Sequence, residues 1–279
     1  MNRRVQTALI LEAPVKRYCP LGSGSKGNST FIETEGAKLL IDAGLSAKAL
    51  GERLGEIGVG LHEIDAILIT HEHIDHIRGV GPLASKLQIP VFANAETAKA
   101  IFASLGICPS FTIFATGEAF TYADLTIHPF TIPHDAIDPV GFTLTSNGWK
   151  LGVCTDLGYA TTLVRHELRG CTHLILEANH HPPMVHASSR PQSLKQRILG
   201  KSGHLSNEAS GLLLKEIYHP GLREVHLAHL SQECNTPETA LTIVRAQIPE
   251  YCDALSLSVA PQHIRAEVVH ISSPCPALA

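Results

Sequence analysis

The chain has 279 residues, of which 44% are hydrophobic, and a formal net charge of -4 at pH 7. This apolar content suffices for a substantial core and excludes a disordered chain, while the acidic balance excludes nucleic-acid binding through a global excess of positive charge. The seven cysteines are widely spaced and form no Cys-x-x-Cys pair. Together with the lack of a signal peptide or a long apolar run, this predicts a cytoplasmic protein with no membrane partner.

The first part of the chain alternates strand-like and helix-like segments. Residues 1–16 carry no motif and are interpreted as a mobile N-terminal extension. Periodic apolar residues predict one helix after the capping residue Ser46 and another over residues 96–105. Apolar runs bounded by turn residues predict strands at 15–21, 29–34, 38–41, 66–70 and 90–93.

The second part continues this alternation without a long linker or a repeat. Residues 111–156 read as a β region in which the turn Ser146-Asn147-Gly148 predicts a hairpin. Further elements are predicted as helices at 161–169, 206–218 and 237–246 and as strands at 173–176 and 225–227. We therefore expect residues 17–279 to form a single α/β domain in which helices cover two sheets.

Four metal-ligand side chains lie within six residues directly after the buried strand predicted at 66–70. They are His71, His73, Asp75 and His76 in the string His-Glu-His-Ile-Asp-His. Imidazole suits Zn, Mn or Fe, and a carboxylate in the cluster allows two cations to sit side by side. The string predicts a dinuclear metallohydrolase with two divalent ions, Zn²⁺ or Mn²⁺. The alternative is a set of histidines that cap a helix or line the core.

Three more metal-capable residues stand where an apolar run ends in a loop. They are His134, Asp156 and His229. Two metals need more ligands than the six-residue string supplies, so these positions are candidates for the rest of the site. For His134 and His229 the alternative is a structural histidine.

The order of these residues and elements resembles the metallo-β-lactamase superfamily, whose fold is a four-layer αββα sandwich with the site along one edge of both sheets. The resemblance implies one metal held by His71, His73 and His134, another held by Asp75, His76 and His229, and Asp156 as a bridge between them. It also implies that Asp42, after the strand at 38–41, orients a ligand histidine.

Two later strings resemble the phosphodiesterase branch typified by tRNA 3′-processing ribonucleases, in which a glutamate supports a histidine beside the metals. Here these residues are Glu177 and His204. The bacterial YycJ/WalJ-like family, whose members are regarded as metal-dependent 5′-to-3′ DNA exonucleases, is more similar still. The chain departs from that family at His181, where an acidic residue is usual, and over 182–191. The likeness is carried by the strings at 21–30, 133–136, 194–199 and 203–207.

Two segments are candidates for contact with substrate. No acidic residue separates Glu177 from Glu208, whereas four basic residues lie there, which suits a phosphate backbone; the alternative is a solvated helix face. The glycine-rich loop 22–30 is either an anion cradle or a plain turn. The predicted substrate-binding residues are Ser25, Lys26, Asn28, Lys195, Arg197 and Asn207.

These features predict metal-assisted hydrolysis of nucleic acid, most specifically by a 5′-to-3′ exonuclease on single-stranded or 5′-ended DNA. His204 is expected to stabilise the developing charge and to protonate the leaving oxygen, with Glu177 orienting it. Asp75, His204 and Glu177 are thus the predicted catalytic residues. The alternatives are a thioester or lactone hydrolase of the same fold, an RNA-processing nuclease, and a metal-binding module without activity.

Overall fold

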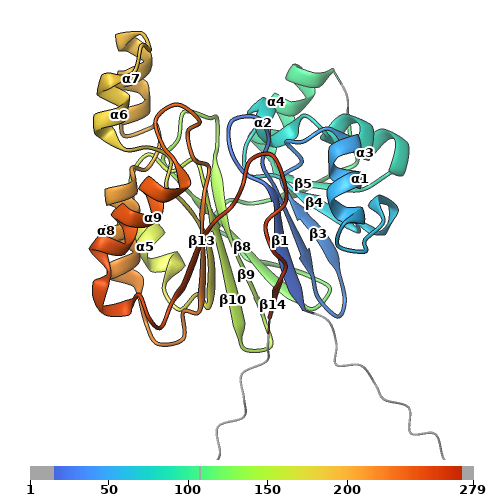
Figure 1. Ribbon diagram of the computed structural model, residues 1–279. Helices are drawn as coiled ribbons and strands as arrows, with labels where there is room; N and C mark the ends of the chain where they lie inside the picture. The colour runs from blue at the N-terminus through green and yellow to red at the C-terminus, as the bar shows by residue number, and fades with distance from the viewer. Residues whose placement is uncertain (1–15, 107, 272–279) are drawn as a thin grey trace, which may run out of the picture.

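A computed structural model describes residues 16–106 and 108–271 as two seven-stranded sheets packed face to face (Figure 1). The first sheet contains, in spatial order, β14 (Val269–His270), β1 (Arg17–Gly22), β2 (Ser29–Glu33), β3 (Lys38–Ile41), β4 (Ala66–Leu68), β5 (Val91–Asn94) and β6 (Phe111–Phe114). The second contains β13 (Ser256–Val259), β12 (Glu224–Ala228), β11 (His173–Glu177), β10 (Trp149–Cys154), β9 (Val140–Ser146), β8 (Leu125–Thr131) and β7 (Phe120–Tyr122).

Helices cover the outer face of each sheet (Figure 1). The first sheet is covered by α1 (Ala47–Gly55), α3 (Val80–Leu87) and α4 (Ala95–Leu105), with the short η1 (Leu61–Glu63) beside α1. The second is covered by α5 (Thr162–Leu168), α8 (Asn207–Ile217) and α9 (Pro237–Gln247), followed by η2 (Pro249–Tyr251). The remaining helices are α2 (Ile74–Ile77), between the sheets at their upper end, and the projecting pair α6 (Pro182–Ala187) and α7 (Gln192–Leu199).

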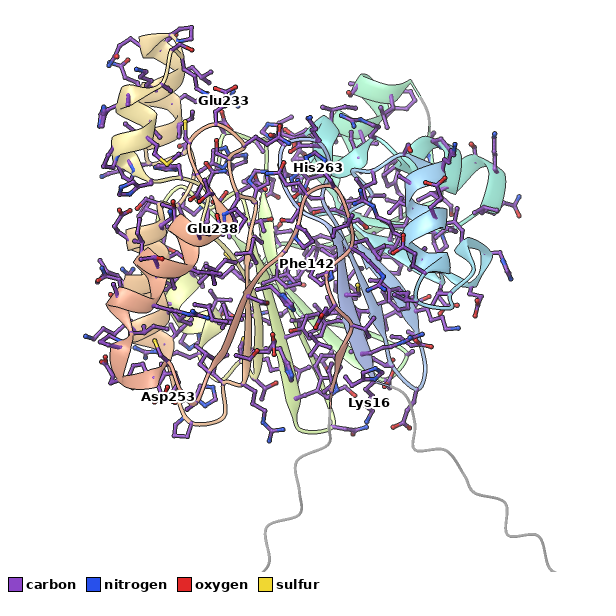
Figure 2. The ribbon with its side chains drawn as sticks, viewed as in Figure 1. Lys16, Phe142, Glu233, Glu238, Asp253 and His263 are labelled. Carbon is purple, nitrogen blue, oxygen red and sulfur yellow. The ribbon has the colours of Figure 1, made fainter. Side chains whose placement is uncertain are left out.

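Side-chain alternation along the strands builds three apolar layers. In β3, Leu39 and Ile41 point between the sheets, whereas Leu40 packs against the helices of the first sheet, as the period of two in a strand requires. Phe142 of β9 is fully buried in the layer between the sheets (Figure 2). The predicted four-layer αββα sandwich is therefore confirmed.

Strand direction places many strand ends at one edge of the sandwich. In the first sheet β3, β4, β5 and β6 run parallel, and in the second sheet β10, β11, β12 and β13 do so. The carboxyl ends of parallel strands meet at a single edge, where the loops that follow them assemble a site.

Most of the predicted elements are present, with small changes of boundary. The hairpin turn is formed by Asn147 (φ 39°) and Gly148 (φ 83°) between β9 and β10, both in the left-handed conformation of a type I′ turn. Lys16 belongs to the fold, because its carbonyl accepts a hydrogen bond from Ile271 N and its ammonium pairs with Glu35. The rest of the predicted extension, residues 1–15, lies outside the described residues.

Two features of the second half were not predicted. The edge strands β13 and β14 are partly exposed and lack a long apolar run. The helices α6 and α7 are short and hold only a small apolar cluster around Val185 and Ile198. No helix in the described part of the chain is long and apolar enough to span a bilayer.

Candidate metal centre and active site

The candidate ligands stand in the segments that follow β4, β8, β10 and β12, at the shared edge of the two sheets; Asp75 and His76 lie on the short helix α2, and the others lie in loops. Asp156 and His229, together with Asp42 after β3, have φ angles of 57°, 56° and 60°. Non-glycine residues adopt this left-handed conformation at a cost, and it recurs at functional sites where surrounding contacts enforce it. For His229 those contacts are hydrogen bonds from its backbone N to Ser23 Oγ (2.7 Å) and from Asn179 Nδ2 to its carbonyl (2.7 Å).

The fold brings all seven predicted ligands together. Their ligand atoms fall into three of four overlapping groups, each with its atoms within 4.8 Å of one another; the fourth joins Asp156 and His229 to Glu177 and His204. The three groups are His71, His73 and His134; His71, His76 and Asp156; and Asp75, His76 and His229. Asp156 shares a group with His71, a predicted ligand of one metal, and with His76, a predicted ligand of the other. It therefore occupies the position expected of a bridging carboxylate.

Asp42 holds two of the ligand histidines. Its Oδ2 accepts a hydrogen bond from His76 Nδ1 (2.7 Å) and another from Thr70 Oγ1 (2.9 Å). The Thr70 hydroxyl in turn accepts from His71 Nδ1 (2.9 Å). One buried carboxylate therefore fixes the orientation of His76 directly and of His71 through Thr70, as second-shell partners of metal ligands do.

Two further histidines are fixed in the same way. His134 Nδ1 lies 3.1 Å from the carbonyl of Gly203, and His229 Nδ1 lies 2.9 Å from Glu177 Oε1. With Nδ1 donating, Nε2 keeps its lone pair. In the described chain, Nε2 of His71 and of His229 is buried and has no hydrogen-bond partner. Buried ring nitrogens aimed into a cluster of carboxylates fit divalent metal ions.

Charge in this buried space is tightly coupled. Burial lowers the pKa of His71 well below its ordinary value, and neighbouring His76 adds to the effect. Burial alone would also lower the pKa of His229, but Asp156, Asp75 and Glu177 together raise it to about 10. The same attraction, led by His229, outweighs burial at Asp156 and holds its pKa well below the usual range. The buried carboxylates therefore stabilise positive charge beside them, whether it is carried by protonated histidines or by metal cations.

Glu177 joins the metal cluster to His204. Its Oε1 accepts from Nδ1 of His204 and from Nδ1 of His229, both at 2.9 Å. Its Oε2 accepts from the backbone N of Leu157 (2.6 Å) and of Leu205 (3.0 Å). Although burial opposes ionisation, the two histidines lower its pKa to about 2. Glu177 is fully buried, and its carboxylate holds both imidazoles in place.

His204 faces a cavity of about 160 Å³ beside the metal ligands. Its side chain retains 21% exposure, and with Nδ1 held by Glu177 its Nε2 is free to contact a ligand. Two of the predicted substrate-binding residues, Ser25 and Arg197, also line this cavity. Arg197 forms an ion pair with Asp135, whereas Lys195 Nζ donates to the carbonyl of His186 (2.7 Å). Lys26 is exposed.

Two of the predicted substrate-binding residues are buried. Asn207 is fully buried and exchanges hydrogen bonds of 2.9 Å with Asn235, so its side chain does not face solvent, and substrate binding by Asn207 stays a prediction. Asn28 is also buried; its Nδ2 lies 3.0 Å from His76 Nε2 and 3.3 Å from Asp75 Oδ2. It faces the ligand cluster instead of solvent.

In the folded chain, carboxylates from outside the stretch between Glu177 and Glu208 pair with two of its four basic side chains. Arg190 pairs with Glu233 at 2.9 Å, and Arg197 pairs with Asp135. Both carboxylates come from distant parts of the chain, so the sequence interval could not reveal them. Thr70, Ser23 and Asn179 were likewise missed as supports of the site, since a hydroxyl or amide beside a strand end carries no distinctive spacing.

Comparison with known proteins agrees with this geometry. Residues 37–229 match the family model described as a β-lactamase superfamily domain. Exodeoxyribonuclease YycJ of Bacillus anthracis is 35% identical over 235 residues, covering 84% of this chain and 89% of that protein. Exodeoxyribonuclease WalJ of Streptococcus pneumoniae is 39% identical over 228 residues, covering 80% of this chain and 85% of that protein.

A solved structure of similar architecture is the metallo-β-lactamase fold protein YhfI from Bacillus subtilis. It aligns with a TM-score of 0.71 and covers 93% of this chain and 100% of its own, at 17% sequence identity. This likeness supports the four-layer fold alone.

Proposed function

This chain belongs to the β-lactamase superfamily and, within it, to the family of the YycJ and WalJ exodeoxyribonucleases, and from that membership we propose that it is a metal-dependent exonuclease acting on DNA. The resemblance predicted from the sequence motifs is thus confirmed. The observation that carries the phosphodiesterase assignment is Glu177, whose single oxygen Oε1 holds both the candidate ligand His229 and the non-ligand His204. Ester hydrolysis by the metal ligands alone would leave His204 without a role.

Two divalent cations fit the ligand groups. One would be held by His71, His73 and His134, and the other by Asp75, His76 and His229, with Asp156 as a ligand shared by both. Bound cations of this kind neutralise phosphate charge and lower the pKa of water that attacks phosphorus. Zn²⁺ and Mn²⁺ both suit donors that are all imidazole and carboxylate.

The protein's own contribution to bond cleavage is proton transfer at His204. Burial opposes its protonation, but Glu177 raises its pKa above the ordinary histidine value. A protonated His204 then donates from Nε2 to the leaving oxygen as the P–O bond breaks and the bond to the attacking water oxygen forms. For release of 5′-mononucleotides, that leaving group is O3′ of the terminal nucleotide.

The proposed substrate is single-stranded or 5′-ended DNA. The cavity at His204 is small, about 160 Å³, and Arg190 and Arg197 line it, so it suits a single strand with its phosphate near the metal ligands. Purified protein with Mn²⁺ or Zn²⁺ should release mononucleotides from 5′-phosphorylated, end-labelled DNA, and a chelator should stop the release. Hydrolysis of thioesters or lactones without nuclease activity, or turnover of RNA alone, would contradict the proposal.

A further inference from the structure

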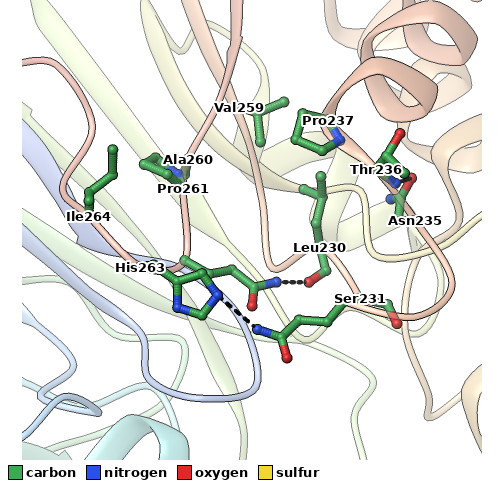
Figure 3. A pocket seen from close by; sticks show the side chains of 12 residues that line it. Leu230, Ser231, Asn235, Thr236, Pro237, Val259, Ala260, Pro261, His263 and Ile264 are labelled. Atoms are coloured by element: carbon green, nitrogen blue, oxygen red, sulfur yellow. Dashed lines mark hydrogen bonds between the residues drawn. The ribbon is translucent and has the colours of Figure 1, made fainter.

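A second and larger cavity adjoins the active site and has no part in the chemistry proposed above. Its volume is about 620 Å³, within the range of roughly 300–1,000 Å³ that small-molecule sites occupy. Figure 3 shows it between the loop after β12 and the loop after β13. Leu230, Pro237, Val259, Pro261 and Ile264 supply an apolar wall, and His263 contributes an imidazole ring.

The cavity shares part of its lining with the catalytic one. Ser231 lines both cavities, and Leu230 directly follows the candidate ligand His229. Gln262 links the loop after β13 to the loop after β12, because its Nε2 donates to the carbonyl of Leu230. The same side chain packs closely over Gly24, where an added Cβ would lie 2.6 Å from the Gln262 amide carbon. A molecule bound at His204 therefore has the larger cavity as its immediate neighbour.

The two cavities differ in charge. Arg190, Arg197 and His204 line the catalytic cavity. The larger cavity has no Asp, Glu, Lys or Arg among its described lining residues. Its polar groups include amides and an imidazole: Gln232 Nε2 lies 3.2 Å from His263 Nε2, and Gln262 Oε1 is buried without a hydrogen-bond partner. A charged phosphate suits the first cavity, and an uncharged, flat, largely apolar group suits the second.

We propose that the larger cavity binds a nucleoside, the base and sugar of a nucleotide next to the scissile phosphate. This inference rests on the proposed nuclease function. Ile264 is 65% exposed at the cavity, so a base placed there covers apolar surface that the free protein leaves in water. Stacking on His263 and the apolar wall tolerates every base, since each presents a flat π face. Subsite binding of this kind gives a preference for nucleic acid without a strong sequence preference.

The test combines variants of the cavity with loss of a base from the substrate. The variants are His263→Ala and Ile264→Ser, and Ile113→Ser is the matched control because Ile113 is 53% exposed on β6, outside the cavity. The substrates are 5′-phosphorylated oligodeoxynucleotides in which one abasic residue is moved along the first four positions. All three side chains are exposed, so thermal unfolding temperatures should stay near that of the unmodified protein.

We expect one abasic position to raise KM of the unmodified protein about tenfold. His263→Ala and Ile264→Ser should raise KM for intact DNA by a similar factor and add little at that abasic position, because base and cavity are lost together. Ile113→Ser should behave as the unmodified protein. Additive losses at every abasic position, or KM unchanged in both cavity variants, would overturn the inference while leaving the nuclease proposal intact. Absence of DNA hydrolysis by the unmodified, metal-loaded protein would instead overturn the nuclease proposal.

Discussion

Replacement of Glu177 by glutamine separates its positioning role from the metal ligands themselves. The carboxylate accepts four hydrogen bonds, two from imidazoles and two from the backbone N–H groups of Leu157 and Leu205. A glutamine amide has one oxygen, and the backbone N–H groups can only donate. The amide oxygen must therefore face the backbone, and its NH₂ group must face Nδ1 of His204 and of His229.

The consequence at His229 is a change of tautomer. With an NH₂ donor opposite Nδ1, the neutral ring carries its proton on Nε2, the nitrogen that is buried without a partner and aimed into the ligand cluster. Loss of a second-shell partner of this kind costs about 10–100-fold in metal affinity or activity, or roughly 1.4–2.8 kcal/mol. We expect Glu177→Gln to lower both metal content and kcat by factors in that range.

The assay measures bound metal after dialysis against a weak chelator together with kcat on single-stranded DNA. Glu208→Gln is the matched control, because Glu208 Oε1 also accepts from a histidine, His181 Nδ1 at 2.7 Å, but its side chain is 36% exposed and its partner is not in the ligand groups. That variant should keep both metal and activity. Wild-type metal content and kcat in Glu177→Gln would refute the assignment of Glu177 as the residue that holds the two imidazoles.

Three other outcomes follow from the same geometry. His204→Ala should lower kcat by about 10²–10⁴-fold with metal content unchanged, and the fall of kcat as pH rises through the raised pKa of His204 should disappear; full activity in the metal-loaded variant would exclude the proton-donor role. In chelated protein, the protonated imidazole of His229, with its pKa raised to about 10, stabilises the fold. This contribution is fully present below the ordinary histidine pKa of 6.5 and is lost as pH rises towards 10, so the unfolding temperature should fall over that interval. An unfolding temperature that stays level there would show that other groups balance the buried carboxylates. Because Arg190 and Arg197 are already paired, the logarithm of DNA affinity should fall with the logarithm of salt with a slope of about -2 or shallower, measured by anisotropy; a slope of about -5 would reveal a basic surface not accounted for here.

The convergence of the candidate ligands could be predicted from sequence because each of them, or the string that contains it, follows an apolar strand. A run such as 66–70 predicts a buried strand, and parallel strands end at a common edge, so the polar residues after them converge. The burial of two predicted substrate-binding residues, Asn28 and Asn207, could not be predicted from sequence. Asn207 follows the helix cap Ser206, and its spacing from His204 does not reveal that its side chain turns inward to Asn235. Side-chain direction at a loop–helix junction depends on packing from β11 and the loop after β12, which lie far away in sequence.

The two carboxylates nearest the ligand histidines show why distant residues matter for function. Asp42 follows β3 of the first sheet and Glu177 ends β11 of the second, yet each holds two histidines. Asp42 holds His76 directly and His71 through Thr70. Glu177 accepts hydrogen bonds from Nδ1 of His204 and of His229. The first set consists of candidate ligands alone, whereas the second joins a candidate ligand to His204, the proposed proton donor. Through Glu177, metal affinity is therefore expected to be coupled to proton donation by His204. Asp42 is expected to influence metal affinity without influencing proton donation. Changes at Asp42 should act through metal content alone, and only changes at Glu177 should also alter the pH dependence of turnover.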